Sequence, residues 1–116
     1  MTTLYRLLLA AGFSLVLAAC VSAPQESFWI DVRTVEEYNA DHIDGDANVP
    51  LATIDPEALA AMYGKDAQIN LYCRSGNRAG QAKTILEAAG FTNVVNAGGI
   101  GDAREVRNIA QSSAAQ

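Results

Sequence analysis

The stretch from residue 69 to residue 80 constrains the fold of this chain more than any other. It reads Ile-Asn-Leu-Tyr-Cys-Arg-Ser-Gly-Asn-Arg-Ala-Gly, an apolar run that ends at Cys73 and enters a loop with two arginines. The apolar residues that follow recur at helical spacing: Ala79, Ala82, Ile85, Leu86 and Ala89. In a strand, loop and helix of this kind the backbone N–H groups of the loop point inward, and the helix N-terminus adds about half a positive charge. We therefore predict a thiol held as thiolate in a cradle that can also hold an anion.

A plainer interpretation of the same cysteine remains open. Cys73 would then be a buried residue at the end of a strand, beside an ordinary surface loop. The two arginines and the glycine packed around it favour the reactive interpretation, because a positive environment is what turns a thiol into a nucleophile.

Strand and helix signals alternate along the rest of the chain. Apolar runs predict strands over 28–32, 47–49, 68–72 and 91–95, and helical patterns cover 35–41, 56–63, 79–89 and 102–110. Glu36 and Glu37 read as a solvated first helical turn, and Gly98-Gly99 reads as a tight turn whose glycines let the backbone pack near the loop. The alternation indicates a single α/β domain with a mainly parallel sheet and helices on both faces. Ligands of such folds lie at the carboxyl ends of the strands, where Cys73 falls.

The N-terminus has the features of an export signal. Thirteen apolar residues follow Arg6, too few to span a bilayer, and they end at Leu17-Ala18-Ala19-Cys20, which resembles a bacterial lipobox. We predict an exported protein on the periplasmic side of a bacterial membrane, anchored by lipid on Cys20. A soluble exported protein and a retained anchor are the alternatives. The predicted segments are a signal peptide over 1–19, a tether over 20–27, a domain over 28–110 and a loose tail over 111–116.

Charge and cysteine count exclude several classes of partner. The net charge is −5, and removal of Arg6 with the signal peptide leaves 7 basic against 13 acidic residues. Such an acidic chain without a basic patch is not expected to bind nucleic acid or to adhere to anionic lipid by charge. With Cys20 acylated, Cys73 is the one free thiol and no intramolecular disulfide can form. One histidine and one thiol cannot close a metal site, and we expect no cofactor.

Three motifs together resemble the single-domain rhodanese family, and within it the exported phage-shock-protein-E type. The first runs from Trp29 to Arg33 and continues through Glu36, Glu37 and Tyr38 to His42-Ile43 and Ala47-Asn48-Val49-Pro50. The second is the loop 72–79, and the third is Asn96-Ala97-Gly98-Gly99-Ile100. Asp44 and Asp46 depart from the family's usual proline and small residue, and the C-terminal helix lacks its frequent aromatic anchor. The resemblance implies a single rhodanese-like domain.

The resemblance also implies a reaction and the residues that serve it. Cys73 would attack the outer sulfur of thiosulfate, or of a similar small anionic donor, and then pass that sulfur to cyanide or a thiol. The loop residues would bind the donor, with the two guanidinium groups gripping its sulfonate oxygens: Arg74, Ser75, Gly76, Asn77 and Arg78. Asp31, Arg33 and His42 would support the active-site end of the fold.

Two other functions fit the same cysteine. A cysteine phosphatase or arsenate reductase also cradles an anion between strand and helix, but it places five residues between cysteine and arginine. Here four residues separate Cys73 from Arg78, which makes a smaller bowl, better matched to a sulfur atom than to a phosphoryl group. A non-catalytic binding module or persulfide sulfur carrier would have the same sequence features, so it stays open.

Overall fold

The structure, a computed structural model, describes residues 26–110. The predicted signal peptide, Cys20, most of the tether and the tail fall outside these residues, so all of them stay predictions. No helix within the described part is long and apolar enough to cross a membrane.

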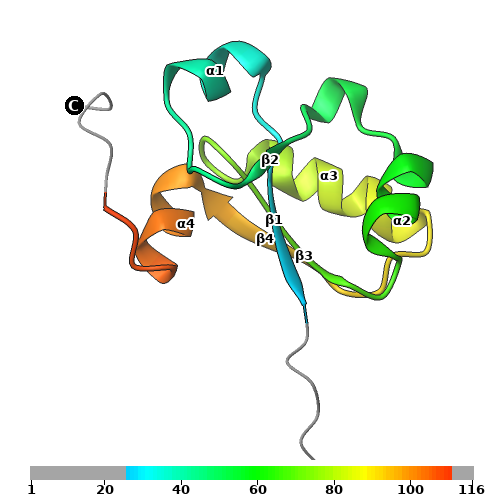
Figure 1. Cartoon of the computed structure of the whole chain (residues 1–116). Coiled ribbons are helices and arrows are strands. Elements are labelled where there is room, and N and C mark those ends of the chain that lie inside the picture. Colours follow the sequence, from blue (N-terminus) through cyan, green and yellow to red (C-terminus); the bar gives the residue numbers. More distant parts are fainter. Residues whose placement is uncertain (1–25, 111–116) are drawn as a thin grey trace, which may run out of the picture.

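Four parallel strands form one sheet in the order β2-β1-β3-β4 (Figure 1). The strands are β1 (Ser27–Asp31), β2 (Ala47–Asn48), β3 (Gln68–Cys73) and β4 (Val94–Gly99). The two central strands, β1 and β3, carry the buried apolar residues that sequence patterning predicted, because strands covered on both faces expose no polar side. The α/β fold with a parallel sheet is thereby confirmed.

Helices lie on both faces of this sheet, as predicted. They are α1 (Val35–Ala40), α2 (Pro56–Tyr63), α3 (Asn77–Ala88) and α4 (Ile100–Val106), with a 3-10 turn, η2, at Leu51–Thr53. One core joins α2 and α3 to the strands through Leu59, Ala82 and Leu86. A second, smaller core lies on the opposite face, where Ala103 of α4 packs with Ile43 and Tyr72. Cys73 belongs to the first core, where it packs with apolar residues of the sheet and of α3.

Two elements near the C-terminus differ from the sequence prediction. The last strand begins at Val94 and not at Phe91, because Phe91 is buried against the first core and its N–H donates to the Leu86 carbonyl at the end of α3. The predicted turn at Gly98-Gly99 is the end of β4, which runs directly into α4. Consequently α4 starts two residues earlier and ends four residues earlier than the helix predicted over 102–110.

An ion pair anchors the C-terminal segment that lacks an aromatic anchor. Nη1 and Nη2 of Arg107 donate to the Asp46 carboxylate at 2.7 and 3.0 Å, and the Tyr72 hydroxyl donates to the same carboxylate at 2.6 Å. The Arg107 guanidinium also lies 4.3 Å from the centre of the Trp29 ring. Asp46, an unusual residue at its position, is therefore the group that ties α4 to the sheet.

A second ion pair reinforces this attachment one turn earlier. Arg104, which is 3% exposed, makes a bidentate pair with Asp41 at 2.8 and 3.0 Å. Both acids come from the short segment between α1 and β2, so this segment pairs with Arg104 of α4 and with Arg107, the C-cap residue that follows it.

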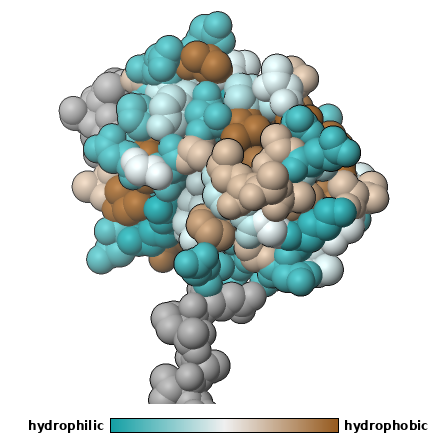
Figure 2. Space-filling model, turned by 45° about the vertical axis from the view of Figure 1, so that its right-hand side comes forward, coloured by the Kyte–Doolittle hydropathy of each residue, from teal (hydrophilic) through white to brown (hydrophobic). Residues whose placement is uncertain are grey.

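The large apolar side chains that are exposed do not gather on one helix or strand. Val35, Met62, Ile85, Val95 and Val106 are each exposed, and each lies on a different helix or strand. On the face in Figure 2, hydrophilic residues surround the apolar ones. Exposed apolar residues spread in this way are ordinary for a folded domain.

We predict that Asp46→Asn lowers the free energy of unfolding by about 2–4 kcal/mol, because it removes the charge shared by Arg107 and Tyr72 in a buried place. Urea unfolding at pH 7 measures the loss. Asp44→Asn is the matched control, since the Asp44 side chain is fully exposed and its removal should leave the unfolding midpoint unchanged. Equal stability of Asp46→Asn and the native protein would contradict the proposed anchor.

Candidate active site

Cys73 ends β3 at the carboxyl edge of the sheet, as the sequence predicted. Its side chain is almost fully buried, at 1% exposure. The sulfur atom accepts the backbone N–H of Gly76 at 2.9 Å and that of Ala79 at 3.5 Å. The donors come from the loop and from the first turn of α3, so the sulfur lies where inward-pointing N–H groups converge.

These donors change the acidity of the thiol. Burial by itself raises the pKa of Cys73, because it removes water from the charged form. The backbone N–H groups of four residues outweigh that effect and hold the pKa below its ordinary value: Ala79, Ser75, Gly76 and Arg78. Backbone N–H dipoles are therefore the main groups that favour the thiolate.

The loop keeps its shape because Gly76 turns the chain. This residue has φ of +99°, in the left-handed region that side chains disfavour, and it stands at the N-terminus of α3. Its carbonyl accepts the side-chain amide of Asn96 at 3.0 Å, as well as the N–H of Gly80. The turn is thus fixed both by α3 and by β4.

β4 supports the loop from behind through an irregular pairing. Leu71 pairs with Asn96 and Cys73 with Gly99, so β4 has one more residue than β3 over this stretch. The extra residue brings the backbone of Gly99 against the carbonyl oxygen of Arg74, where a Cβ atom would overlap it. Only glycine permits this approach, in agreement with the interpretation that these glycines let the backbone pack near the loop.

Arg78 and Glu37 form a bidentate ion pair at the rim of the loop. Nη1 and Nη2 of Arg78 donate to Oε1 and Oε2 of Glu37 at 2.6 and 3.0 Å. The Arg78 hydrogen bond, against the smaller effect of burial, lowers the pKa of Glu37 to about 2. The interpretation of Glu37 as part of a solvated turn was wrong, whereas Glu36 is indeed exposed.

The other predicted substrate-binding residues surround the mouth of the loop. Arg74, Ser75 and Asn77 are exposed, and Gly76 is half-buried between them. The loop thus brings together all five residues named for donor binding, but it directs one guanidinium to α1 and the other toward solvent. Their roles in binding remain predictions.

Two of the predicted supporting residues brace the end of β1. The Arg33 guanidinium donates to both carboxylate oxygens of Asp31, at 2.8 to 3.0 Å, and reaches the carbonyl of Asp41 at 2.6 Å. The Asn48 side-chain amide donates to the carbonyls of Asp31 and Arg33. The segment after β1 is thereby tied to α1 and β2, and it carries Glu37 to the rim.

His42, the third predicted supporting residue, takes part in a local turn. Its Nδ1 lies 3.0 Å from the Tyr38 carbonyl and its Nε2 lies 3.2 Å from Asp44, while its ring stacks on Tyr38. The contacts are those of a hydrogen-bonded structural histidine, and its support of the active-site end stays a prediction.

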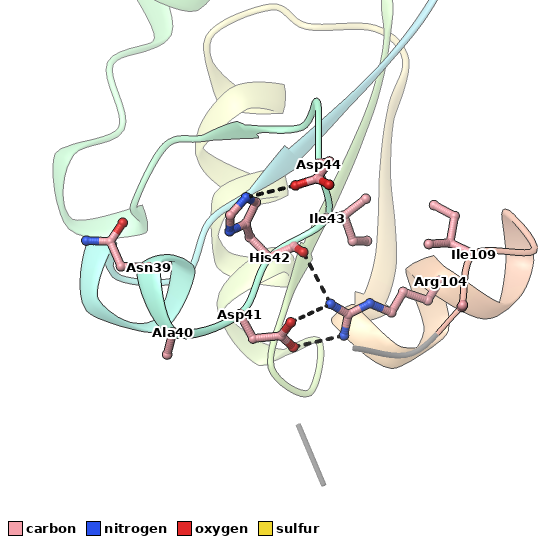
Figure 3. A pocket seen from close by; sticks show the side chains of 9 residues that line it. Asn39, Ala40, Asp41, His42, Ile43, Asp44, Arg104 and Ile109 are labelled. Atoms are coloured by element: carbon pink, nitrogen blue, oxygen red, sulfur yellow. Dashed lines mark hydrogen bonds and ion pairs between the residues drawn. The ribbon is translucent and has the colours of Figure 1, made fainter. Parts of the chain in front are cut away.

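A hollow of about 600 Å³ lies next to His42, between the segment 39–44 and α4 (Figure 3). Arg104 points across it to Asp41 and to the His42 carbonyl. Polar groups in this hollow bond one another, and Cys73 does not line it. Among residues 26–110 no three His, Cys, Asp or Glu side chains gather to hold a metal ion.

Fold and site define an α/β protein in which a buried cysteine of lowered pKa accepts the N–H groups of the loop that follows it. The chain belongs to the family of the rhodanese-like domain, whose model matches residues 17–102. It is 40% identical over 90 residues to thiosulfate sulfurtransferase PspE of Escherichia coli, covering 76% of this chain and 86% of that protein. It is also 34% identical over 67 residues to the putative sulfur carrier protein YrkF of Bacillus subtilis, covering 58% of this chain but only 35% of that longer protein.

The solved structures agree with this assignment. A structure described as rhodanese with anions from E. coli superposes with a TM-score of 0.61 at 41% identity. The match covers 66% of this chain and 91% of that one, so the shared part is the described domain.

We predict that Gly99→Ala raises the pKa of Cys73 by about one unit, because a Cβ at Gly99 displaces the Arg74 carbonyl and weakens a donor to the sulfur. The rate of iodoacetamide alkylation as a function of pH measures the shift. Gly101→Ala is the control, since a Cβ there meets nothing within 4 Å. An unshifted profile for Gly99→Ala would mean that the close approach does not shape the loop.

Proposed function

We propose that this protein is a thiosulfate sulfurtransferase that carries sulfane sulfur as a persulfide on Cys73. One observation carries the proposal: the Cys73 sulfur lies where the loop's N–H groups converge, with a lowered pKa. The similarity to PspE, which is named for this activity, supports the same function. The acceptor would be cyanide or a thiol.

The reaction has two displacement steps. In the first, the Cys73 thiolate attacks the outer sulfur of thiosulfate, the S–S bond of the donor breaks, and sulfite leaves with the bonding electrons. In the second, cyanide attacks the outer sulfur of the persulfide, thiocyanate forms, and the Cys73 thiolate returns. The loop's N–H groups are placed to stabilise the negative sulfur in the thiolate and in the persulfide alike.

A persulfide carrier without turnover is the second candidate. The similarity to YrkF, named as a putative sulfur carrier, favours it. A carrier would accept sulfur on Cys73 as readily as an enzyme, so its distinguishing property is the second step. Rapid transfer to cyanide or a small thiol indicates an enzyme, while a persulfide that persists with those acceptors indicates a carrier.

Mass spectrometry after exposure to thiosulfate tests the proposed function. We expect the native protein to gain the mass of one sulfur atom on Cys73 and to lose it when cyanide is added. Cys73→Ser should gain nothing and show no turnover, because an alcohol cannot hold sulfane sulfur, while its melting temperature shows that it folds. Sulfur transfer by Cys73→Ser above a few per cent of the native rate would refute the proposal.

Arg74 is the residue that we propose as the main contact for the donor's sulfonate, because it is exposed at the mouth of the loop. We predict that Arg74→Ala lowers kcat/KM for thiosulfate by about 10- to 150-fold, the value of a charge-assisted hydrogen bond of about 1.5–3 kcal/mol. Steady-state thiosulfate:cyanide kinetics measure the change. Lys83→Ala, which removes the same charge from farther along α3, is the control and should keep native kinetics. A near-native kcat/KM for Arg74→Ala would remove Arg74 from the site.

We also propose that the mature chain begins at an acylated Cys20 on the periplasmic side of a bacterial membrane. Support comes from the sequence Leu17-Ala18-Ala19-Cys20, and from Pro24, which would follow the alternative cut after Ala23. Two or three acyl chains would anchor the protein firmly, where a single chain would not. The intact mass of membrane-extracted protein decides the matter, and an unmodified N-terminus elsewhere would refute the anchor.

A further inference from the structure

The backbone of Arg78 belongs to the cradle of Cys73, but its guanidinium pairs with a residue of another helix. Its backbone N–H is one of the donors that favour the thiolate, so its side chain leaves from the rim of the same cradle. The guanidinium, however, lies in the bidentate pair with Glu37 on α1, at 2.6 and 3.0 Å. Two parallel charge-assisted bonds fix a guanidinium more firmly than one. The position of this cation is thus determined by a carboxylate 41 residues earlier in the chain.

Glu37 is itself held in place. Its Oε1 accepts the backbone N–H and the hydroxyl of Thr34, each at 3.1 Å, which closes the capping box of α1. The carboxylate is ionised throughout the neutral range, since its pKa is about 2. It therefore offers Arg78 a constant and rigid partner.

Other charged groups around Cys73 are few. Asp31 and Arg33 pair with each other after β1. Arg74 lies in the loop, and Asp102 of α4 accepts the Gly99 N–H. On β3, burial and the bond to Asp46 raise the pKa of Tyr72, which stays neutral. Arg78 and the Cys73 sulfur do interact by charge. A change in the position of Arg78 is hence the change that would most alter the charge at the sulfur.

Too much positive charge at the sulfur would reduce its reactivity. The intrinsic nucleophilicity of a thiolate falls with its pKa, by about threefold for each unit, and the best attacking thiol has a pKa near the ambient pH. Neutral N–H donors lower the pKa moderately, whereas a guanidinium in contact with the sulfur would lower it further. Once the thiol is fully ionised, any further lowering only weakens the nucleophile.

We propose that Glu37 is a positioning residue for Cys73: it holds the Arg78 guanidinium on α1 and so keeps a full positive charge off the sulfur. This inference rests on the proposed role of Cys73 as nucleophile. The two arginines then have different roles. Arg74 contacts the donor at the mouth of the loop, and Arg78 links α3 to α1 through its pair with Glu37. Glu37 thus preserves the reactivity of the sulfur without touching the substrate.

Alkylation of Cys73 by the neutral reagent iodoacetamide tests this role without any sulfur donor. The rate is followed as a function of pH by the mass of the Cys73 peptide. Glu37→Gln keeps the capping box, which accepts Gln, but loses the charge that holds Arg78. We expect the midpoint of the profile to fall by about one pH unit and the plateau rate at high pH to fall about threefold. Glu36→Gln removes the same charge from the same exposed turn and should leave both values near native.

A double variant shows whether Glu37 acts through Arg78. In Glu37→Gln/Arg78→Gln neither charge is present, so the midpoint should return to near the native value. A midpoint for Glu37→Gln that is unchanged, raised, or shifted no more than that of Glu36→Gln would overturn the proposal. So would a double variant that keeps the midpoint of Glu37→Gln. Thiosulfate turnover, measured in parallel on the native protein, reports on the proposed function separately.

Discussion

The contacts between β4 and the loop after Cys73 are the constraint on which the rest of the site depends. The loop is too short to fix its own backbone, and its N–H groups converge only if the turn at Gly76 stays closed. The Asn96 side chain closes it, donating to the Gly76 carbonyl and accepting the Gly98 N–H at 2.9 Å. The extra residue in β4 also places Gly99 against the Arg74 carbonyl of the loop. The loop supplies the N–H donors to the sulfur, and the neighbouring strand β4 helps to hold them in position.

Near the Cys73 loop, charged side chains are arranged in ion pairs. Neutral N–H groups surround the sulfur, while the ion pairs lie farther out: Asp31 with Arg33 beyond β1, and Glu37 with Arg78 at the rim. Among the described residues, no buried side-chain nitrogen or oxygen lacks a hydrogen-bond partner. The pair of Glu37 and Arg78 stiffens the edge of the sheet that carries Cys73, because it joins α1 to α3.

Local patterns predicted the parts of the protein that local physics determines. The strand, loop and helix around Cys73, and the caps Thr34 and Asp55, depend on residues within a few positions of one another. The pairs Glu37–Arg78 and Asp46–Arg107 join residues 41 and 61 positions apart, and nothing in the spacing of charges indicates such partners. The predicted bounds of the last strand, residues 91–95, were wrong for a related reason. Its limits depend on the pairing with β3 and on the burial of Phe91, both of which exist only in the folded chain.

Arg104 of α4 and its C-cap residue Arg107 have a consequence for the order in which the chain assembles. Arg104 and Arg107 reach acids 63 and 61 residues earlier, and both acids lie in the segment between α1 and β2. Contacts that close so long a stretch of chain become favourable only after shorter-range pairings have reduced the entropy that they cost. We therefore expect the C-terminal helix to dock late, onto a sheet that is already formed. Once docked, it holds the α1–β2 segment through both ion pairs, so we expect this segment and α4 to open and close as one cooperative unit.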